Sequence, residues 1–330
     1  MNRWKIGVAL GLTLGVALTV GVILHVGAAE LWAAVRRVGF DGFAVFTLYS
    51  LAGFLPLGWA WWVVAPGAGS RRWLLFPWGR LLRDSAADVL PFAQIGGLLV
   101  GLRAVQVRGV PERLAVASQL VDVTMEMAAQ LFYTLFGLAM LLAVLRHATG
   151  AQELVWATAA AIGAGALGLA AFVALQGRGV DLVGALGSRW IKDTRERAAA
   201  IRAELAAIYA RPARLAAGLA WHSAGWMLSG AGAWLALAFM GVHVAVWKVL
   251  ALESLVAAVK SMAFLTPGAL GFQEGAYALI APLFGVSPEA AVAVSLLRRA
   301  KDLVIGVPAM LAWQAGELAE RPKAAAGEAP

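Results

Sequence analysis

The sequence predicts an all-α membrane protein: a polytopic bundle of about seven spanning helices that also contains two interrupted hydrophobic segments. Three observations support this prediction. Hydrophobic residues make up 61% of the 330 residues and charged residues only 14%, and the mean hydropathy is +0.77. Most apolar residues form blocks about as long as a bilayer is thick. Two of these blocks are broken by Gly and Pro at corresponding places, which indicates an internal repeat.

This composition excludes several classes of protein, namely soluble enzymes, disordered regulators, coiled coils and disulfide-stapled secreted domains. The chain has no Cys, which excludes disulfides, thiolate metal sites and a Cys nucleophile. Its net charge of +8 is typical of the basic loops that orient spanning helices; no nucleic-acid motif accompanies it, so we expect no nucleic-acid partner. The four His are scattered and no Ser–His–Asp, Walker or dinucleotide pattern occurs. We therefore expect no metal, no cofactor and no enzymatic activity.

The first half of the predicted bundle covers residues 1–176. Apolar spans are expected at 7–27 and 43–64. Residues 66–84 are basic and aromatic, so we expect them to lie on the membrane surface. Residues 90–107 are apolar but broken by Gly and Pro, and are too short for an ordinary span, so they predict a re-entrant helix. The arginines of the expected surface segment are Arg71, Arg72, Arg80 and Arg83.

Residues 112–145 predict one long or broken helix with acidic residues in its first part, and residues 154–175 predict a Gly- and Ala-rich span suited to close packing. Residues 177–214 hold eight basic residues and are expected to form a cytoplasmic loop, part of it helical. The second half follows at 215–316, so that one transmembrane domain covers residues 1–316. Its expected segments are spans at 215–240, 244–264 and 289–316, an interrupted segment at 265–286, and then a polar tail at 317–330.

The distribution of basic residues predicts that the N-terminus is cytoplasmic. With this topology, fourteen Lys and Arg residues lie inside. The four that lie outside are Arg36, Arg37, Arg146 and Lys248. This imbalance agrees with the positive-inside rule. We expect a multi-pass protein of the bacterial inner membrane.

The two interrupted segments, 90–107 and 265–286, are related to each other. The first is followed by GVPE at 109–112 and the second by GVSPE at 285–289. Pro in the first helical turn presets φ, and the Glu carboxylate meets the positive end of the helix dipole. Broken segments at matching places in two halves are typical of the central site of a transporter. The sequence leaves open whether the halves are parallel or inverted. The residues expected to break the helices are Pro91, Gly96, Gly97, Pro267, Gly268 and Gly271.

Charged residues also occur in segments apolar enough to lie at membrane depth. A charge at the bilayer centre costs about 2.5–3.5 kcal/mol, so these residues predict internal ion pairs, a hydrated cavity, or both. Arg298 and Arg299 point about 100° apart on a helix. Asp302 cannot neutralise both, so we expect one of them to be left for a phosphate or carboxylate. The intramembrane charges are Asp122, Glu126, Glu253, Lys260, Glu274, Arg298, Arg299, Lys301 and Asp302.

Three segments carry a resemblance to a known family. TPGALGFQEG at 266–275, followed by SLLRRAKD at 295–302, resembles the second signature of the flippase-like membrane domain of lysylphosphatidylglycerol synthases and their stand-alone relatives. LPFAQIGG at 90–97, with Arg103 after it, resembles the first signature, and its FAQIGG form is most similar to the hopanoid-biosynthesis-associated membrane proteins of the HpnL type. The resemblance covers about residues 1–316 and implies lipid translocation or a membrane step in placing hopanoid-type lipids.

Two departures limit what the resemblance implies. The family carries a Glu-Arg pair before its helix Asp, whereas residues 118–122 read SQLVD, so a role for Asp122 is not carried over. No acyltransferase-like domain follows Pro330, so lysyl transfer is not expected either.

The leading hypothesis is a lipid translocator that binds a polar head in a charged cavity between the two halves. The expected head-binding residues are Arg103, Lys260, Glu274, Arg298 and Arg299, balanced by Asp122, Glu126 and Asp302. Three alternatives remain open. In the first, the charges form structural salt bridges only. In the second, the protein is a non-transporting accessory that holds a lipid substrate or a lipid-biosynthesis enzyme at the membrane through residues 177–214. In the third, it is a proton-coupled small-solute carrier that depends on Asp122 or Glu126. His222 is expected to make a hydrogen bond between helices.

Overall fold

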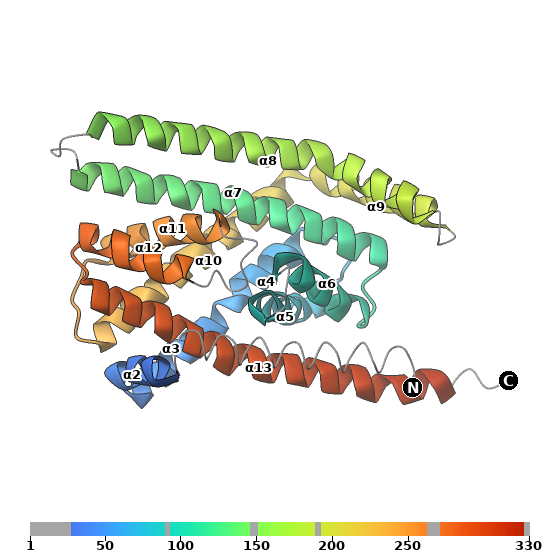
Figure 1. The fold of residues 1–330 in the computed structure, drawn as a ribbon. Helices are drawn as coiled ribbons and strands as arrows, with labels where there is room; N and C mark the ends of the chain where they lie inside the picture. Colours follow the sequence, from blue (N-terminus) through green and yellow to red (C-terminus); the bar gives the residue numbers. More distant parts are fainter. Residues whose placement is uncertain (1–27, 90–92, 146–150, 189–192, 263–270, 327–330) are drawn as a thin grey trace.

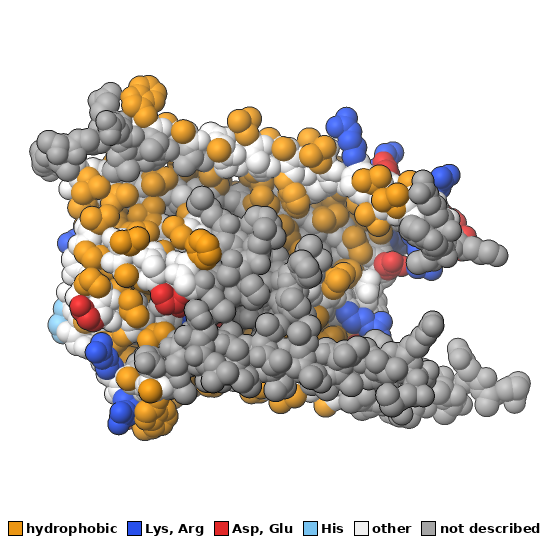
Figure 2. All heavy atoms as spheres, in the orientation of Figure 1, with side chains coloured by type: hydrophobic (Ala, Val, Ile, Leu, Met, Phe, Trp, Pro, Cys, Tyr) orange, Lys and Arg blue, Asp and Glu red, His pale blue; other side chains and the backbone are white. Residues whose placement is uncertain are grey.

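The computed structural model of the chain describes residues 28–89, 93–145, 151–188, 193–262 and 271–326. All regular secondary structure in these residues is helical, which confirms the all-α prediction (Figure 1). Hydrophobic side chains spread over the face shown in Figure 2, and Lys and Arg side chains gather towards its two ends. This distribution is typical of a helical membrane bundle with polar ends.

Three helical segments of the described chain are long and apolar enough to cross a membrane: Phe40–Val63, Glu112–Leu145 and Ile162–Leu186. The first two correspond to predicted spans, and the third extends the predicted span 154–175 by a further part of its helix. The predicted span 7–27 lies outside the described residues. The prediction of about seven spans is therefore tested only in part.

The described chain begins with three short helices, α2 (Ala28–Val38), α3 (Phe40–Ala52) and α4 (Phe54–Val63). A 3₁₀ turn, η1 (Ser70–Arg72), follows. Helices α3 and α4 together form the first of the three apolar segments, and α4 packs against α5 and α10. This packing places the apolar α4 behind the charged helices described below.

Helix α6 (Ala93–Gln106) occupies the first interrupted region and forms a helical hairpin with the preceding helix α5 (Leu75–Val89). Its arms approach closely because glycines face α5. A Cβ on Gly97 would lie 2.3 Å from the Arg83 carbonyl oxygen. The first arm was predicted to lie on the membrane surface, and for Arg80 and Arg83 this was wrong, because both are buried in the bundle. The reason is that each has a carboxylate partner on the long helix at 112–145, which follows the hairpin.

The second hairpin is also built from two helical arms. It consists of α11 (Val246–Met262), then α12 (Phe272–Ile280) and the 3₁₀ turn η3 (Ala281–Phe284). Gly271 starts α12 at φ +78°, a conformation that favours glycine, and its N–H donates to the Glu274 carboxylate at 2.9 Å. The segment between the two arms, with Pro267 and Gly268, lies outside the described residues, as does Pro91 in the first hairpin.

Each hairpin is followed by a long helix, α7 (Glu112–Leu145) and α13 (Pro288–Ala326). Gly109 and Gly285 precede these helices at φ +84° and +82°, so the turns predicted to be related share a left-handed glycine. In Figure 1, α7 and α13 run in opposite directions. The two units of hairpin plus long helix are therefore inverted, which answers the question that the sequence left open.

Each long helix also packs on the hairpin of the other half. On α7, the Cα of Gly137 lies against α11, where an added Cβ would meet Ser254. On α13, an added Cβ at Gly306 would meet Ser85 of α5 at 3.3 Å. The crossing is reciprocal, as an inverted pair of units requires.

Along the chain, three helices connect the first unit to the second: α8 (Ala151–Gly187), α9 (Thr194–Tyr209) and α10 (Pro212–Phe239). The expected cytoplasmic loop at 177–214 is largely helical: its first residues complete α8, and α9 folds back on α7 and α8. Arg202 of α9 pairs with Asp181 of α8 at 2.8 Å on the exposed surface. Helix α10 contacts α4, α7 and α11.

Candidate functional site

A cavity of about 330 Å³ lies where the two units meet. It is lined by residues of α3, α4, α5, α7, α10, α11 and α13, including the hydroxyls of Tyr49, Ser50 and Ser229. Both units contribute charges to it. The first contributes Arg80, Arg83, Asp84 and Glu126, and the second contributes Lys260, Arg298, Lys301 and Asp302.

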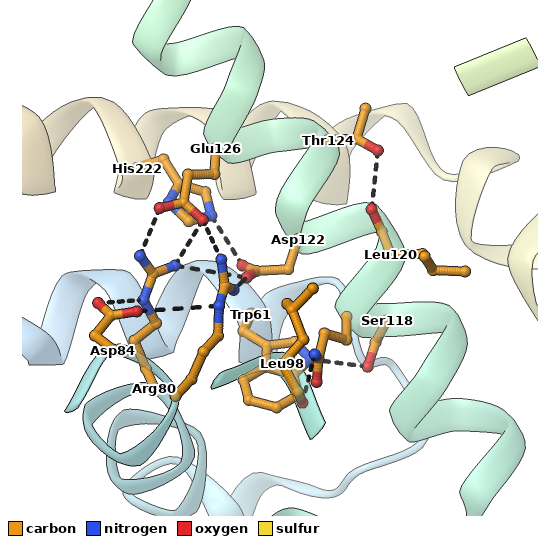
Figure 3. A network of polar contacts seen from close by, with 12 residues as sticks. Trp61, Arg80, Asp84, Leu98, Ser118, Leu120, Asp122, Thr124, Glu126 and His222 are labelled. Carbon is orange, nitrogen blue, oxygen red and sulfur yellow. Dashed lines mark hydrogen bonds and ion pairs between the residues drawn. The ribbon is translucent and has the colours of Figure 1, made fainter. Parts of the chain in front are cut away.

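On the first unit, the two arginines of α5 bind the two acids of α7 (Figure 3). Arg80 holds the Glu126 carboxylate through both Nη atoms, at 2.9 and 2.5 Å, and its Nε donates to Asp84 at 2.9 Å. Arg83 donates to Asp122 at 2.9 Å and to Glu126 at 2.6 Å. Glu126 therefore accepts hydrogen bonds from both arginines.

The spacing of these residues explains the arrangement. Arg80 and Arg83 are three residues apart on α5, and Asp122 and Glu126 are four apart on α7, so each pair projects from one face of its helix. The arginines are only 4% and 6% exposed, and Asp122 is fully buried. Removing one partner of such a buried network leaves an uncompensated charge, which costs about 3–5 kcal/mol.

His222 joins this network from α10. Its Nε2 lies 2.8 Å from Asp122 Oδ1, and its side chain is fully buried. The expected hydrogen bond between helices is therefore present, and its partner is the acid whose role the family resemblance left open.

On the second unit, Arg298 of α13 pairs with Glu253 of α11 and donates to the Ser229 carbonyl oxygen of α10 at 2.9 Å. The Tyr277 hydroxyl of α12 donates to the other oxygen of Glu253. Glu253 and Tyr277 are buried, so the pair links α11, α12 and α13 behind the cavity wall. Only the Arg298 end of this group lines the cavity.

Arg299 forms a separate pair with Glu274 of α12. Its Nε and Nη2 bind the two carboxylate oxygens at 2.6 and 3.1 Å, and Ser295 Oγ donates to the same carboxylate at 3.1 Å. The sequence considered only Asp302 as an acid partner for Arg298 and Arg299, whereas in the structure the hairpin supplies each arginine with a Glu. Glu274 and Arg299 do not line the cavity, and their contacts join α12 to α13.

The two units carry opposite charges at matching positions. Asp122 follows Ser118 by four residues, and Arg299 follows Ser295 by four, with both serines in the repeated sequence after the turn. In the first unit the hairpin contributes the cations and the long helix the acids, whereas in the second unit the reverse holds. Both units therefore pair a hairpin with a long helix through ion pairs, but the signs of the charges on the two elements are exchanged.

Of the remaining predicted site residues, some line the cavity and others do not. Lys260 and Asp302 line the cavity, and Asp302 pairs with Lys301. Arg103 does not line it: its side chain is 48% exposed and pairs with Glu317 at the far end of α13. Gly96 and Gly97 belong to α6, where Gly97 faces α5 as described above. Among the described residues, no group of three or more His, Asp or Glu residues is placed to hold a metal ion.

Sequence reasoning missed Arg80, Arg83 and Asp84 as members of the site. A signal was present, because α7 carries two acids at membrane depth and no neighbouring cation on its own buried face. Their partners must come from elsewhere, and the Arg-x-x-Arg-Asp pattern at 80–84 has the matching helical spacing.

The family described as lysylphosphatidylglycerol synthase TM region matches residues 7–309. The chain belongs to this family. The match spans both units, the cavity and both charge networks, and it confirms the family resemblance predicted from the sequence. It identifies the chain as a membrane protein related to lipid metabolism. No curated protein and no solved structure matches the chain.

Proposed function

We propose that this protein translocates a lipid across the membrane by holding its polar head in the cavity between the two inverted units. The observation that supports this most is the cavity itself, which is lined by charged residues from both units at membrane depth. A head group in hydrocarbon loses its hydration, and a charged cavity replaces part of that hydration. Inverted units around a central site are the architecture in which one side and then the other opens.

The cavity wall formed by α11 and α13 indicates which kind of polar head group the protein binds. Lys260, Arg298 and Lys301 face the cavity there, opposite Glu126 and Asp84 of the first unit. The second-unit wall carries three cations and one carboxylate, and the first-unit wall carries two arginines and two carboxylates. This mixed lining with an excess of cations suits a head that has both an anionic group and hydrogen-bond donors. A hopanoid-type lipid is the candidate that the FAQIGG segment favours. We assign transport, since the charged lining of the cavity suits the holding of a polar head.

We further propose that the protein lies in a bacterial inner membrane with its N-terminus in the cytoplasm. Arg80 and Arg83 no longer count as loop residues, but twelve basic residues still lie on the expected inside against four on the outside. Arg113 pairs with Glu204, and Arg197 with Glu112, so the α6–α7 turn and α9 lie at one end of the bundle. This basic end is the side that the positive-inside rule assigns to the cytoplasm.

The test uses purified protein in vesicles with a labelled phospholipid in one leaflet, whose exposure is followed with a membrane-impermeant quencher. We expect the wild type to move the lipid and Lys260→Met to reduce the rate at least about tenfold, since each lost cation contact of about 1.4 kcal/mol corresponds to a factor of ten. Lys248→Met, on the same helix but outside the cavity, is the control. No movement with wild type overturns the proposal, and equal loss in both variants contradicts the site.

The same assay separates the alternatives. An accessory protein leaves the lipid in its leaflet while binding biosynthetic enzymes through the exposed α9 region. A small-solute carrier takes up solute without moving lipid.

A further inference from the structure

His222 has one unused nitrogen in a fully buried position. Its Nε2 lies 2.8 Å from Asp122 Oδ1, whereas its Nδ1 has no hydrogen-bond partner among the described residues. Asp122 also accepts from Arg83, as an ionised carboxylate does. An ionised carboxylate only accepts, so the hydrogen bond assigns the neutral imidazole proton to Nε2. The Nδ1 lone pair is therefore left to bind a further proton.

The packing of α10 leaves His222 facing acids. The face that carries Gly218, His222 and Gly225 lies against α4, where an added Cβ on Gly225 would be 2.4 Å from Leu57. No residue of α4 is titratable. From α7 the groups facing His222 are Asp122 and Glu126 (Figure 3). Other charged or titratable groups around the cavity are Arg80, Arg83 and Asp84 of α5, Tyr49 of α3, Lys260 of α11, and Arg298, Lys301 and Asp302 of α13.

The charged groups of α5 and α7, which we call the first network, do not balance. Two arginines, Arg80 and Arg83, meet three carboxylates, those of Asp84, Asp122 and Glu126. One negative charge is in excess among these five groups, of which Asp122 is buried and Asp84 and Glu126 are partly exposed, and a proton on His222 would cancel it. His is the side chain whose ordinary titration falls between about pH 5 and 8. Across the cavity, Lys260 supplies the other compensating charge.

The network reaches the cavity without a break. Asp122 is joined to Arg83, Arg83 to Glu126, and both Arg83 and Glu126 line the cavity. An anionic head on the opposite wall would engage Lys260, and the excess charge of the first network would then lose its compensation. A proton on His222 restores the balance, so anion binding and proton binding favour each other.

We propose that His222 and Asp122 form a proton-binding site that couples lipid movement to a proton gradient. The proton adds to the Nδ1 lone pair, Nε2–H remains donated to Asp122, and no other bond changes. Because the site is buried in this conformation, the proton exchanges when the bundle opens around the cavity, which is the movement that also exposes the head. This inference rests on the proposed function, since it requires a translocated lipid.

The first experiment measures proton binding alone, by NMR titration of the purified protein in lipid nanodiscs with isotope-labelled His. The four His give four signals, and His222→Gln removes and so identifies one. The measurement covers about pH 5 to 8, the interval in which His side chains ordinarily change charge. We expect the His222 signal to respond to the added proton and Asp122→Asn to alter that response. A His222 signal that stays in one protonation state over this range overturns the proton site.

The second experiment imposes a pH gradient of one unit on the vesicles, with the membrane potential clamped. One proton moved with each lipid predicts about a tenfold asymmetry between the leaflets at equilibrium. His222→Gln is expected to remove this asymmetry, and His243→Gln, an exposed His in the α10–α11 connection, to retain it.

The outcomes separate the two proposals. If the wild type moves lipid to equal amounts in both leaflets under the gradient, the coupling is wrong and translocation stands. If His222 titrates but no lipid moves, translocation is wrong and the coupling falls with it, although the proton site itself remains.

Discussion

At the residue scale, the molecule is organised around paired charges that lie where hydrocarbon is expected. The same Arg–carboxylate chemistry occurs in two settings: a buried network of Arg83, Asp122 and Glu126, and an exposed pair of Arg202 with Asp181. The two settings differ mainly in burial. Their comparison therefore measures what burial adds to an ion pair.

Arg83→Met is expected to lower the free energy of unfolding by about 3–5 kcal/mol, because it leaves Asp122 and Glu126 buried with less compensation. Arg202→Met, the control, removes an exposed pair and is expected to change it by about 0–1 kcal/mol. Denaturant unfolding of both variants in the same detergent makes the comparison. Similar losses in the two variants would contradict the buried network.

The double variant Arg83→Met, Asp122→Leu tests the same pair in a second way. Replacing both partners by apolar side chains removes the lone buried charge, so we expect the double variant to be more stable than Arg83→Met alone. The measurement is a double-mutant cycle of unfolding free energies. Strictly additive losses would show that the two side chains do not interact.

At the element scale, glycines set how closely the hairpin arms approach. Gly97 of α6 lies on Arg83 of α5, so the glycine that breaks the apolar pattern also positions an arginine of the network. The interruption of residues 90–107 was visible in the sequence. Its partner was not, because α5 is amphipathic and its arginines appear solvent-facing until α7 is placed beside it.

Gly97→Ala is expected to destabilise the protein by about 1–3 kcal/mol, since its Cβ would overlap the Arg83 carbonyl oxygen. Gly168→Ala on α8 is the matched control, because an added Cβ there meets nothing within 4 Å. Thermal unfolding of the two variants in the same detergent compares them. Equal melting temperatures would mean that the α5–α6 hairpin is packed more loosely than the structure shows.

At the scale of the whole molecule, much of the account follows from the sequence. The all-α class, the two interrupted segments and the family follow from apolar blocks, Gly and Pro positions and short signatures. The direction of the second unit does not, because GVPE and GVSPE look alike whichever way the helix runs. The pairing of Arg298 with Glu253 and of Arg299 with Glu274 depends on contacts between α11, α12 and α13, and helical spacing within one segment cannot reveal them.

The two units can be linked without interference because the chain has no native Cys. Ser85 of α5 and Gly306 of α13 are close across the boundary, with an added Cβ at Gly306 lying 3.3 Å from the Ser85 Cβ. This separation is near the range of about 3.5–4.5 Å between the Cβ atoms of a disulfide. We expect Ser85→Cys with Gly306→Cys to form a disulfide on oxidation, seen as a faster-migrating band on a non-reducing gel.

The most direct test of the central claim is lipid movement in vesicles that contain this double-cysteine protein, measured on one sample after oxidation and again after reduction. If the head passes through the cavity between units that move against each other, movement stops in the oxidised state and returns on reduction, while the rate of each single-cysteine variant is the same after oxidation and after reduction. Undiminished lipid movement with the two units covalently locked together would contradict it.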